Sequence, residues 1–290
     1  MRKPFFAAAV TAAVVGSTLV ALPAGAAVGD VPTDCAVYTT AYRSDGQRLS
    51  YGYDARKTSI TSYPGDKLAW VPSAQQQIGA AGDTDFFVSS ELVTHPTDGY
   101  LYDLERQGER TNGVWKMTKN TATRMASGFA GTRILTNGTY LYRVAGTSLY
   151  RYKVSYTNGK YVVSAPTTLR TTSWDSVKTL TYERTEGTGS AAVDVLIGTK
   201  TNGELKEWRI NLANPATIGS TVLQSTGWAG FGSLSSGYCQ SHQAGRPLIG
   251  ITTAGAASIY FDANQSDRIG TDIKGGSLGS LGWTAKSYGQ

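Results

Sequence analysis

The amino-acid sequence predicts an all-β protein, a five-bladed β-propeller whose last blade is closed by N- and C-terminal strands. Three observations lead to this prediction. Short β-branched segments alternate with frequent turns, a two-part pattern recurs along the chain, and each end of the chain carries one half of that pattern. Signals for helices are nearly absent.

The apolar segments are short and bounded by Gly or Pro, as at 193–199 and 248–253. Many turns contain Asn-Gly or Asp-Gly, which favours hairpins because Gly adopts positive φ at no steric cost. Examples are Asp45-Gly46, Asn137-Gly138, Asn158-Gly159 and Asn202-Gly203. Many short strands with frequent turns are typical of a sandwich, a barrel or a propeller.

Internal repetition favours the propeller among these folds. The first part of the repeat is a small residue, an aromatic residue and, five or six positions on, an apolar residue. Its aromatic positions are Phe129, Trp174 and Trp228, with Phe86 as an eroded copy. The second part is a turn ending in Gly, followed by an apolar-aromatic strand. Its turn glycines are Gly46, Gly99, Gly138, Gly203 and Gly255.

The two ends of the chain each carry an incomplete repeat. Residues 274–278 begin a fifth copy that has no second half, and residues 44–51 form a second half that has no beginning. If the two ends of the chain together complete one repeat, the repeats close into a ring. Five blades then contain about 53 residues each. An irregular sandwich or barrel is the alternative fold.

The first 26 residues predict a secretory signal peptide, followed by a single propeller domain over 27–290. A basic start at Arg2 and Lys3 precedes an apolar run over 5–22, and Ala24-Gly25-Ala26 supplies the small residues of a cleavage site. The run is short for a membrane span, although an uncleaved anchor is the alternative. We therefore expect a secreted, extracellular protein with no membrane span.

The net charge and the number of cysteines indicate which classes of partner and cofactor to expect. Two of the 27 Lys and Arg residues lie in the signal, so 25 basic residues face 21 acidic ones in the rest of the chain. This mild excess, without long basic runs, predicts no nucleic-acid partner. Cys35 and Cys239 predict one disulfide that latches the ring where it closes. No pattern for a metal or another cofactor is present.

Two segments resemble the tachylectin-type five-bladed propellers, which are lectins. Ser225-Thr226-Gly227-Trp228-Ala229-Gly230-Phe231 is similar to the Gly-Gly-Trp-x-x-Phe strand of that family, with Thr226 where the first Gly is expected. Residues 137–142 are similar to its Gly-x-Leu-Tyr-x-Val strand. The resemblance implies recognition of amino-sugar or related glycans. The repeats here are longer and less alike than those of the family, which puts regular sites in every blade in doubt.

A sugar site combines an aromatic ring against the pyranose with amides and carboxylates that bind its hydroxyls. We therefore predict a non-catalytic, carbohydrate-binding propeller. Its candidate ligand-binding residues are Trp174, Trp228, Phe129, Asn137, Asn202 and Asp175, with Arg133 nearby. The competing interpretation of the aromatic residues is that they pack between blades.

Two other functions remain open at this stage. An extracellular protein-binding module of a toxin or adhesin would show a broad apolar or Tyr-rich patch. A glycoside hydrolase would need paired carboxylates in the channel, for which Asp103, Asp194 and Asp262 are candidates. We expect Asp194 to face outward on an alternating strand. His95 and His242 accompany no nucleophile motif, so we expect no enzyme.

Overall fold

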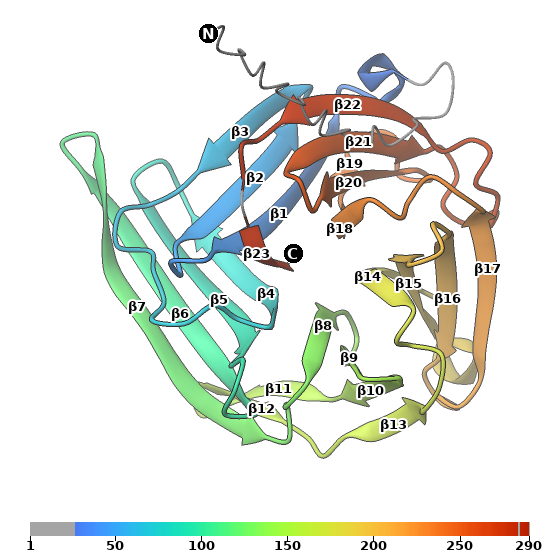
Figure 1. Cartoon of the computed structure of the whole chain (residues 1–290), viewed down its shortest axis with the longest axis horizontal. Helices are drawn as coiled ribbons and strands as arrows, with labels where there is room; N and C mark the ends of the chain where they lie inside the picture. Colours follow the sequence, from blue (N-terminus) through green and yellow to red (C-terminus); the bar gives the residue numbers. More distant parts are fainter. Residues whose placement is uncertain (1–26, 284, 290) are drawn as a thin grey trace, which may run out of the picture.

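The computed structural model describes residues 27–283 and 285–289, and the predicted signal peptide lies outside them. Five sheets stand around a central axis as the blades of a propeller (Figure 1), which confirms the predicted fold. The connections include two short 3₁₀ turns, η1 (Val28–Asp30) and η2 (Gly189–Ala191). Among the described residues, no helix has the length and apolar character needed to cross a membrane.

Each blade has an innermost strand beside the axis and three strands outside it. Blade 1 contains β23 (Ala285–Gly289), β1 (Cys35–Arg43), β2 (Arg48–Asp54) and β3 (Lys57–Thr61). Blade 2 contains β4 (Ala74–Gly82), β5 (Phe86–Thr94), β6 (Tyr100–Thr111) and β7 (Val114–Ser127). Blade 3 contains β8 (Thr132–Asn137), β9 (Leu141–Ala145), β10 (Ser148–Tyr152) and β13 (Thr167–Arg170).

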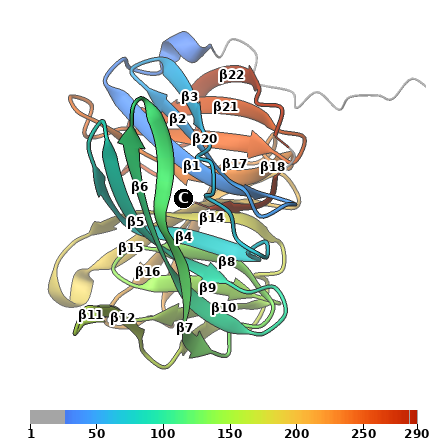
Figure 2. The same cartoon turned by 90° about the vertical axis from the view of Figure 1, so that its left-hand side faces the viewer.

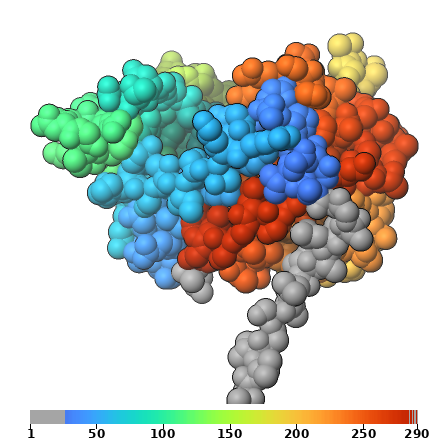
Figure 3. All heavy atoms as spheres, turned by 90° about the horizontal axis from the view of Figure 1, so that it is seen from above, coloured from blue at the N-terminus to red at the C-terminus, as the bar shows by residue number. Residues whose placement is uncertain are grey.

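Blade 4 contains β14 (Val177–Glu186), β15 (Val193–Lys200), β16 (Leu205–Asn211) and β17 (Ile218–Gln224). Blade 5 contains β18 (Phe231–Ser236), β20 (Arg246–Thr252), β21 (Ala256–Asp262) and β22 (Lys274–Ser280). The hairpin of β11 (Val154–Thr157) and β12 (Lys160–Val163) is inserted in blade 3. The long β6–β7 hairpin stands at the side of the ring (Figure 2), and its tip forms the green lobe in Figure 3.

Blade 1 is built from both ends of the chain, as predicted. The C-terminal strand β23 pairs with β1, with Thr40 opposite Gly289. The predicted start of the fifth copy was wrong, because residues 274–278 lie in β22, the outermost strand of blade 5. The strand that closes the ring begins at Ala285, and the aromatic residue before it is Trp283.

The predicted disulfide is present and lies at this closure point. Cys35 begins β1, and Cys239 lies opposite it on the two-residue strand β19 (Tyr238–Cys239). Strand β19 follows the innermost strand of blade 5 in the chain. The bridge therefore ties blade 5 to blade 1 across 204 residues of sequence.

One turn glycine of the repeat was assigned wrongly. Between the second and third strands of blades 1, 2, 4 and 5, the turns contain Gly46, Gly99, Gly203 and Gly255, all with φ between 73° and 90°. The equivalent glycine of blade 3 is Gly146, with φ of 56°, and not Gly138, which lies between the first and second strands. The corrected glycines at 46, 99, 146, 203 and 255 lie 53, 47, 57 and 52 residues apart.

The same turn joins every blade to the next one. A backbone N–H at the entry to the following blade donates to a carbonyl of the turn. The five bonds are Leu68 to Gly46 at 3.0 Å, Phe129 to Gly99 at 2.8 Å, Trp174 to Thr147 at 3.2 Å, Trp228 to Gly203 at 3.1 Å and Leu281 to Gly255 at 2.9 Å. The repeat is thus a backbone connection as well as a sequence pattern.

Charged side chains are buried between blades 1 and 2. Arg106 donates from Nε to Asp66 Oδ1 at 2.9 Å and lies 3.3 Å from Glu91 Oε1 through Nη1. Arg48 pairs with the same glutamate from the neighbouring blade. Two cations and two anions therefore balance within this interface, which offsets the cost of removing them from water.

Candidate functional site

The recurring aromatic residues pack between blades and offer no surface to a ligand. Phe129, Trp174 and Trp228 are 1%, 5% and 2% exposed. Trp174 lies 5.3 Å from Trp208, and Trp228 lies 4.7 Å from Tyr260, between ring centroids. A buried ring cannot stack on a sugar, so the prediction of these three residues as platforms is corrected in favour of packing. Phe86 is not a copy of them, since it begins β5.

The predicted polar residues do not meet in one site. Asp175 lies in the exposed turn before β14, and Asn202 lies in the turn after β15, where Thr201 donates to the Ser176 carbonyl. Both are at the face of the ring where the inner strands begin. Asn137 ends the inner strand β8 and lies at the opposite face. Only Asn137 of these three lines one of the two cavities described below.

The end of the channel where the inner strands finish holds a cavity of about 280 Å³, which we call the tyrosine cavity. Strands β1, β4, β8, β14 and β18 surround it. Three tyrosines and three side-chain amides distinguish its wall: Tyr38, Tyr182, Tyr238, Gln76, Gln77 and Asn137. Among the described residues, the wall contains no carboxylate, histidine or cysteine.

Tyr38 presents an exposed aromatic ring to this cavity. It lies opposite Gly52 on β2, and a Cβ on Gly52 would lie 2.9 Å from two ring carbons. The ring therefore rests on the bare backbone of the neighbouring strand, while 52% of the residue remains exposed. The hydroxyl donates to Asp54 Oδ2 at 3.4 Å. Partial burial and the nearby Asp54 carboxylate raise the pKa of Tyr38, which keeps it a neutral phenol.

A second glycine supports Tyr182 in the same way. A Cβ on Gly138 would lie 2.1 Å from Cδ2 of Tyr182, so only glycine allows the ring to cover the turn after β8. The hydroxyl of Tyr182 lies 2.9 Å from Thr185 Oγ1 and its backbone N–H donates to Thr136 Oγ1 at 2.7 Å. Burial raises the pKa of Tyr182. Gly138 thus serves close approach rather than a positive-φ hairpin turn.

Tyr238 and Gln77 complete the polar and aromatic wall. Tyr238 is 60% exposed and lies opposite Ala36 on β1, diagonally from Tyr38 on the same face of the sheet. Gln77 accepts a 3.2 Å bond from Arg48 through Oε1, which orients its amide. Exposed rings beside oriented amides can contact both the apolar face and the hydroxyls of a sugar.

These tyrosines were missed by sequence reasoning, which followed the aromatic residues that recur once per blade. A residue type that recurs in every blade serves a purpose common to all blades, which here is packing between them. Tyr38 and Gly52 become neighbours only through the pairing of β1 with β2. A tyrosine opposite a glycine in a hairpin could have indicated an exposed, supported ring. Recognising that pair requires the register of the two strands, which the sequence alone does not give.

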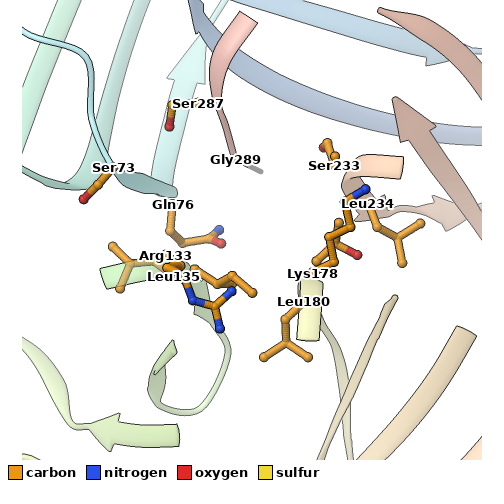
Figure 4. Close-up of a pocket in the computed structure, with 13 residues that line it drawn as sticks. Ser73, Gln76, Arg133, Leu135, Lys178, Leu180, Ser233, Leu234, Ser287 and Gly289 are labelled. Carbon is orange, nitrogen blue, oxygen red and sulfur yellow. The ribbon is translucent and has the colours of Figure 1, made fainter. Parts of the chain in front are cut away.

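The opposite end of the channel, where the inner strands begin, holds a smaller cavity of about 180 Å³. Residues from all five innermost strands line it (Figure 4). Arg133 on β8 and Lys178 on β14 supply its charged groups, and we call it the basic mouth. Its described wall also contains no carboxylate.

The three candidate carboxylates of a hydrolase lie away from both cavities. Asp103, Asp194 and Asp262 are on β6, β15 and β21, none of which is an innermost strand. Asp262 is buried against Arg246, with an Nη2 to Oδ2 distance of 2.9 Å, and burial raises its pKa. Asp103 is half-buried beneath the inserted β11–β12 hairpin, close enough for its charge to act on Tyr161.

Asp194 is fully buried, and the expectation that it faces outward was wrong. Its Oδ2 accepts a 2.6 Å bond from the Tyr142 hydroxyl, and its Oδ1 accepts bonds from Thr139 at 2.8 Å and Thr185 at 2.6 Å. Three hydroxyl donors compensate the buried charge. Because Tyr142 and Thr139 belong to blade 3, this carboxylate joins blades 3 and 4.

No family model and no curated protein matches this chain. The "BBS1N in complex with ARL6DN" structure is 13% identical, over 81% of this chain and 68% of that one, with a TM-score of 0.33. A functionally unknown protein from Desulfotomaculum acetoxidans DSM 771 is 11% identical over 89% and 86% of the two chains, with a TM-score of 0.35. A Lactobacillus plantarum protein is 11% identical over 84% and 66%, with a TM-score of 0.31. These similarities identify neither a function nor the tachylectin-type family.

Proposed function

We propose that this protein is a secreted carbohydrate-binding propeller that holds its ligand in the tyrosine cavity without transforming it. The observation that carries the proposal is the exposed ring of Tyr38, supported by Gly52 and flanked by Tyr238 and oriented amides. Such a wall suits a pyranose, because one face of the sugar is apolar and its edge bears hydroxyls. The absence of carboxylates from the described cavity wall supports binding over hydrolysis.

The proposed extracellular location has two supports. The N-terminal sequence has the order of a secretory signal, and the Cys35–Cys239 disulfide forms in oxidising compartments. Secretion would be tested by expressing the full chain and determining the N-terminus of the protein in the medium. Cleavage after Ala26 supports the proposal, and retention of the full chain in the cells contradicts it.

The sugar proposal is tested by screening the purified protein on a glycan array and titrating the best ligand. We expect Tyr38→Ala and Tyr238→Ala each to weaken binding about tenfold, as loss of a stacked aromatic platform does. Tyr38→Phe keeps the ring and retains most of the affinity. Tyr156→Ala is the matched control, because Tyr156 is 65% exposed but lies on the inserted hairpin.

Two results would reject a sugar site in this cavity. One is the absence of any glycan that binds at high micromolar concentration. The other is a ligand whose affinity is unchanged by Tyr38→Ala and Tyr238→Ala. The exposed large apolar side chains of the described residues are spread over all five blades, which gives the protein-binding alternative no single broad patch.

A further inference from the structure

We propose that the basic mouth is an oxyanion-binding site at the opposite end of the channel from the tyrosine cavity, and this proposal does not rest on the proposed sugar binding. Gln76 lines both cavities, whereas Arg133, Lys178 and Ser287 line only the basic mouth of the two. Arg133 and Lys178 occupy the same position on consecutive innermost strands. In each strand a β-bulge interrupts the register at this position, between Thr132 and Ile134 in β8 and between Val177 and Thr179 in β14. The repeat of the fold therefore brings two cations to one rim.

Arg133 is held in place by backbone carbonyls of the rim. Its guanidinium donates to the carbonyls of Trp174 at 2.8 Å, Val177 at 3.1 Å and Gly146 at 3.3 Å. Arginine has five N–H donors, so these bonds leave two for a ligand. Partial desolvation of the guanidinium lowers the pKa of Arg133, and nearby Asp175 opposes that shift.

Lys178 is anchored similarly and also keeps donors available. Its Nζ donates to the Ala229 carbonyl in the next blade at 2.5 Å, which uses one of its three N–H groups. Neither Lys178 nor Arg133 has a carboxylate within ion-pair distance among the described residues. Carbonyl dipoles orient the two cations but do not neutralise them, so the rim retains positive charge.

Ser287 supplies an independent polar group in the wall of this cavity. It is 5% exposed, and its Oγ is buried in the wall of this cavity without a hydrogen-bond partner among the described residues. A buried hydroxyl without a partner is costly, and one that faces a cavity can be satisfied by a water molecule or by a polar group of a ligand. Figure 4 shows Ser287 across the cavity from Arg133 and Lys178.

Two cations, a hydroxyl and a wall without carboxylates match a sulfate, a phosphate or a carboxylate group. The group can belong to a free inorganic ion or to an anionic polymer. Arg133 is exposed at the end of the channel, so both a free ion and a group on a polymer can reach it. The shared chemistry is an oxyanion bound by guanidinium, ammonium and hydroxyl donors.

Calorimetric titration with sodium sulfate at constant ionic strength tests the site. We expect saturable binding that weakens about tenfold in Lys178→Met and in Arg133→Gln, and a few-fold in Ser287→Ala. Lys160→Met is the matched control, because it removes the same charge from the exposed tip of the inserted hairpin. Lys178→Arg keeps the cation and should retain binding, which separates charge from any loss of fold.

Dextran sulfate and neutral dextran distinguish the two sources. Dextran sulfate that competes with inorganic sulfate and binds more tightly indicates a polymer-borne group, whereas binding of inorganic sulfate alone indicates a free ion. The proposal is overturned if sulfate does not bind saturably, or if Lys160→Met weakens it as much as Lys178→Met. Tyr38→Ala should leave sulfate binding unchanged. Failure of the oxyanion proposal therefore leaves the sugar proposal intact, and failure of the sugar proposal leaves the oxyanion proposal intact.

Discussion

The backbone N–H of Leu68 donates a 3.0 Å hydrogen bond to the carbonyl oxygen of Gly46, which joins the turn of blade 1 to the connection that enters blade 2. The two segments approach so closely that a Cβ on Gly46 would lie 2.0 Å from the carbonyl oxygen of Leu68. The equivalent glycine of blade 3, Gly146, has no atom within 4 Å of its Cβ position. Equivalent turns therefore differ in how closely they are packed.

This difference predicts unequal costs for the same substitution. Gly146→Ala should lose about 1 kcal/mol of unfolding free energy, because alanine is strained at positive φ. Gly46→Ala should lose roughly 2–4 kcal/mol, because the methyl group also displaces Leu68. Urea unfolding of the two variants measures both losses. Equal losses would show that the contact at Gly46 relaxes without cost.

A second prediction concerns the buried carboxylate that joins blades 3 and 4. Asp194→Asn should destabilise the protein by about 1–3 kcal/mol, because the amide nitrogen cannot accept a bond from a hydroxyl. Tyr142→Phe should cost less, since it removes one of the three donors. The double variant Asp194→Asn/Tyr142→Phe should cost less than the sum of the two, as expected for residues in one network. Additive losses in denaturant unfolding would contradict the proposed coupling.

The fold was predicted from sequence features that repeat along the chain. This explains why the propeller was predicted correctly and why one turn was assigned wrongly. Ring closure was predicted from an incomplete repeat at each chain end, and the closure is correct although the C-terminal half-repeat was placed at 274–278 instead of at β23. The blade 3 turn was misassigned because Asn137-Gly138 matches a hairpin turn in sequence, whereas Gly146 follows an alanine and stands in no such pair. Gly138 is required by the ring of Tyr182, a contact between blades that no local pattern reveals.

The candidate site was less predictable, for a related reason. Trp174 and Trp228 have aromatic rings of the kind that stack on sugars, but the residue type alone does not show whether a ring is exposed. Their repetition favoured packing, since a residue needed in every blade serves the architecture. Tyr38 occurs once, and its exposure depends on Gly52 lying opposite it. Arg133 and Lys178 could have been found as cations four residues after a recurring aromatic residue.

A third prediction concerns the disulfide at the closure point. Reduction of Cys35–Cys239 should lower the unfolding free energy by about 3–5 kcal/mol, because the bridge constrains a long segment of the unfolded chain. Unfolding in urea with and without dithiothreitol measures the loss. The Cys35→Ala/Cys239→Ala variant should match the reduced protein and should not respond to dithiothreitol. An unchanged midpoint after complete reduction would mean that β23–β1 pairing alone secures the ring.

The last prediction concerns pH and Asp103 on β6. Burial first, and the charge of Glu105 second, raise the pKa of Asp103 to about 6 in the folded protein. Its Oδ1 is buried without a hydrogen-bond partner among the described residues, which agrees with a disfavoured charge. In the unfolded chain an aspartate titrates near pH 4. The folded state therefore binds the proton more tightly, and this residue's contribution to stability falls as pH rises from about 4 to about 6.

Asp103→Asn removes this titration and should be more stable than the wild type at pH 7, but not at pH 4. The gain should not exceed about 1 kcal/mol, since solvent screens a half-buried carboxylate. Glu109→Gln is the control, because Glu109 is an exposed acid on the same strand. Urea unfolding at both pH values gives the difference for each variant. If the stability difference between Asp103→Asn and the wild type is the same at pH 4 and pH 7, the carboxylate is not destabilised by its burial beneath the inserted hairpin.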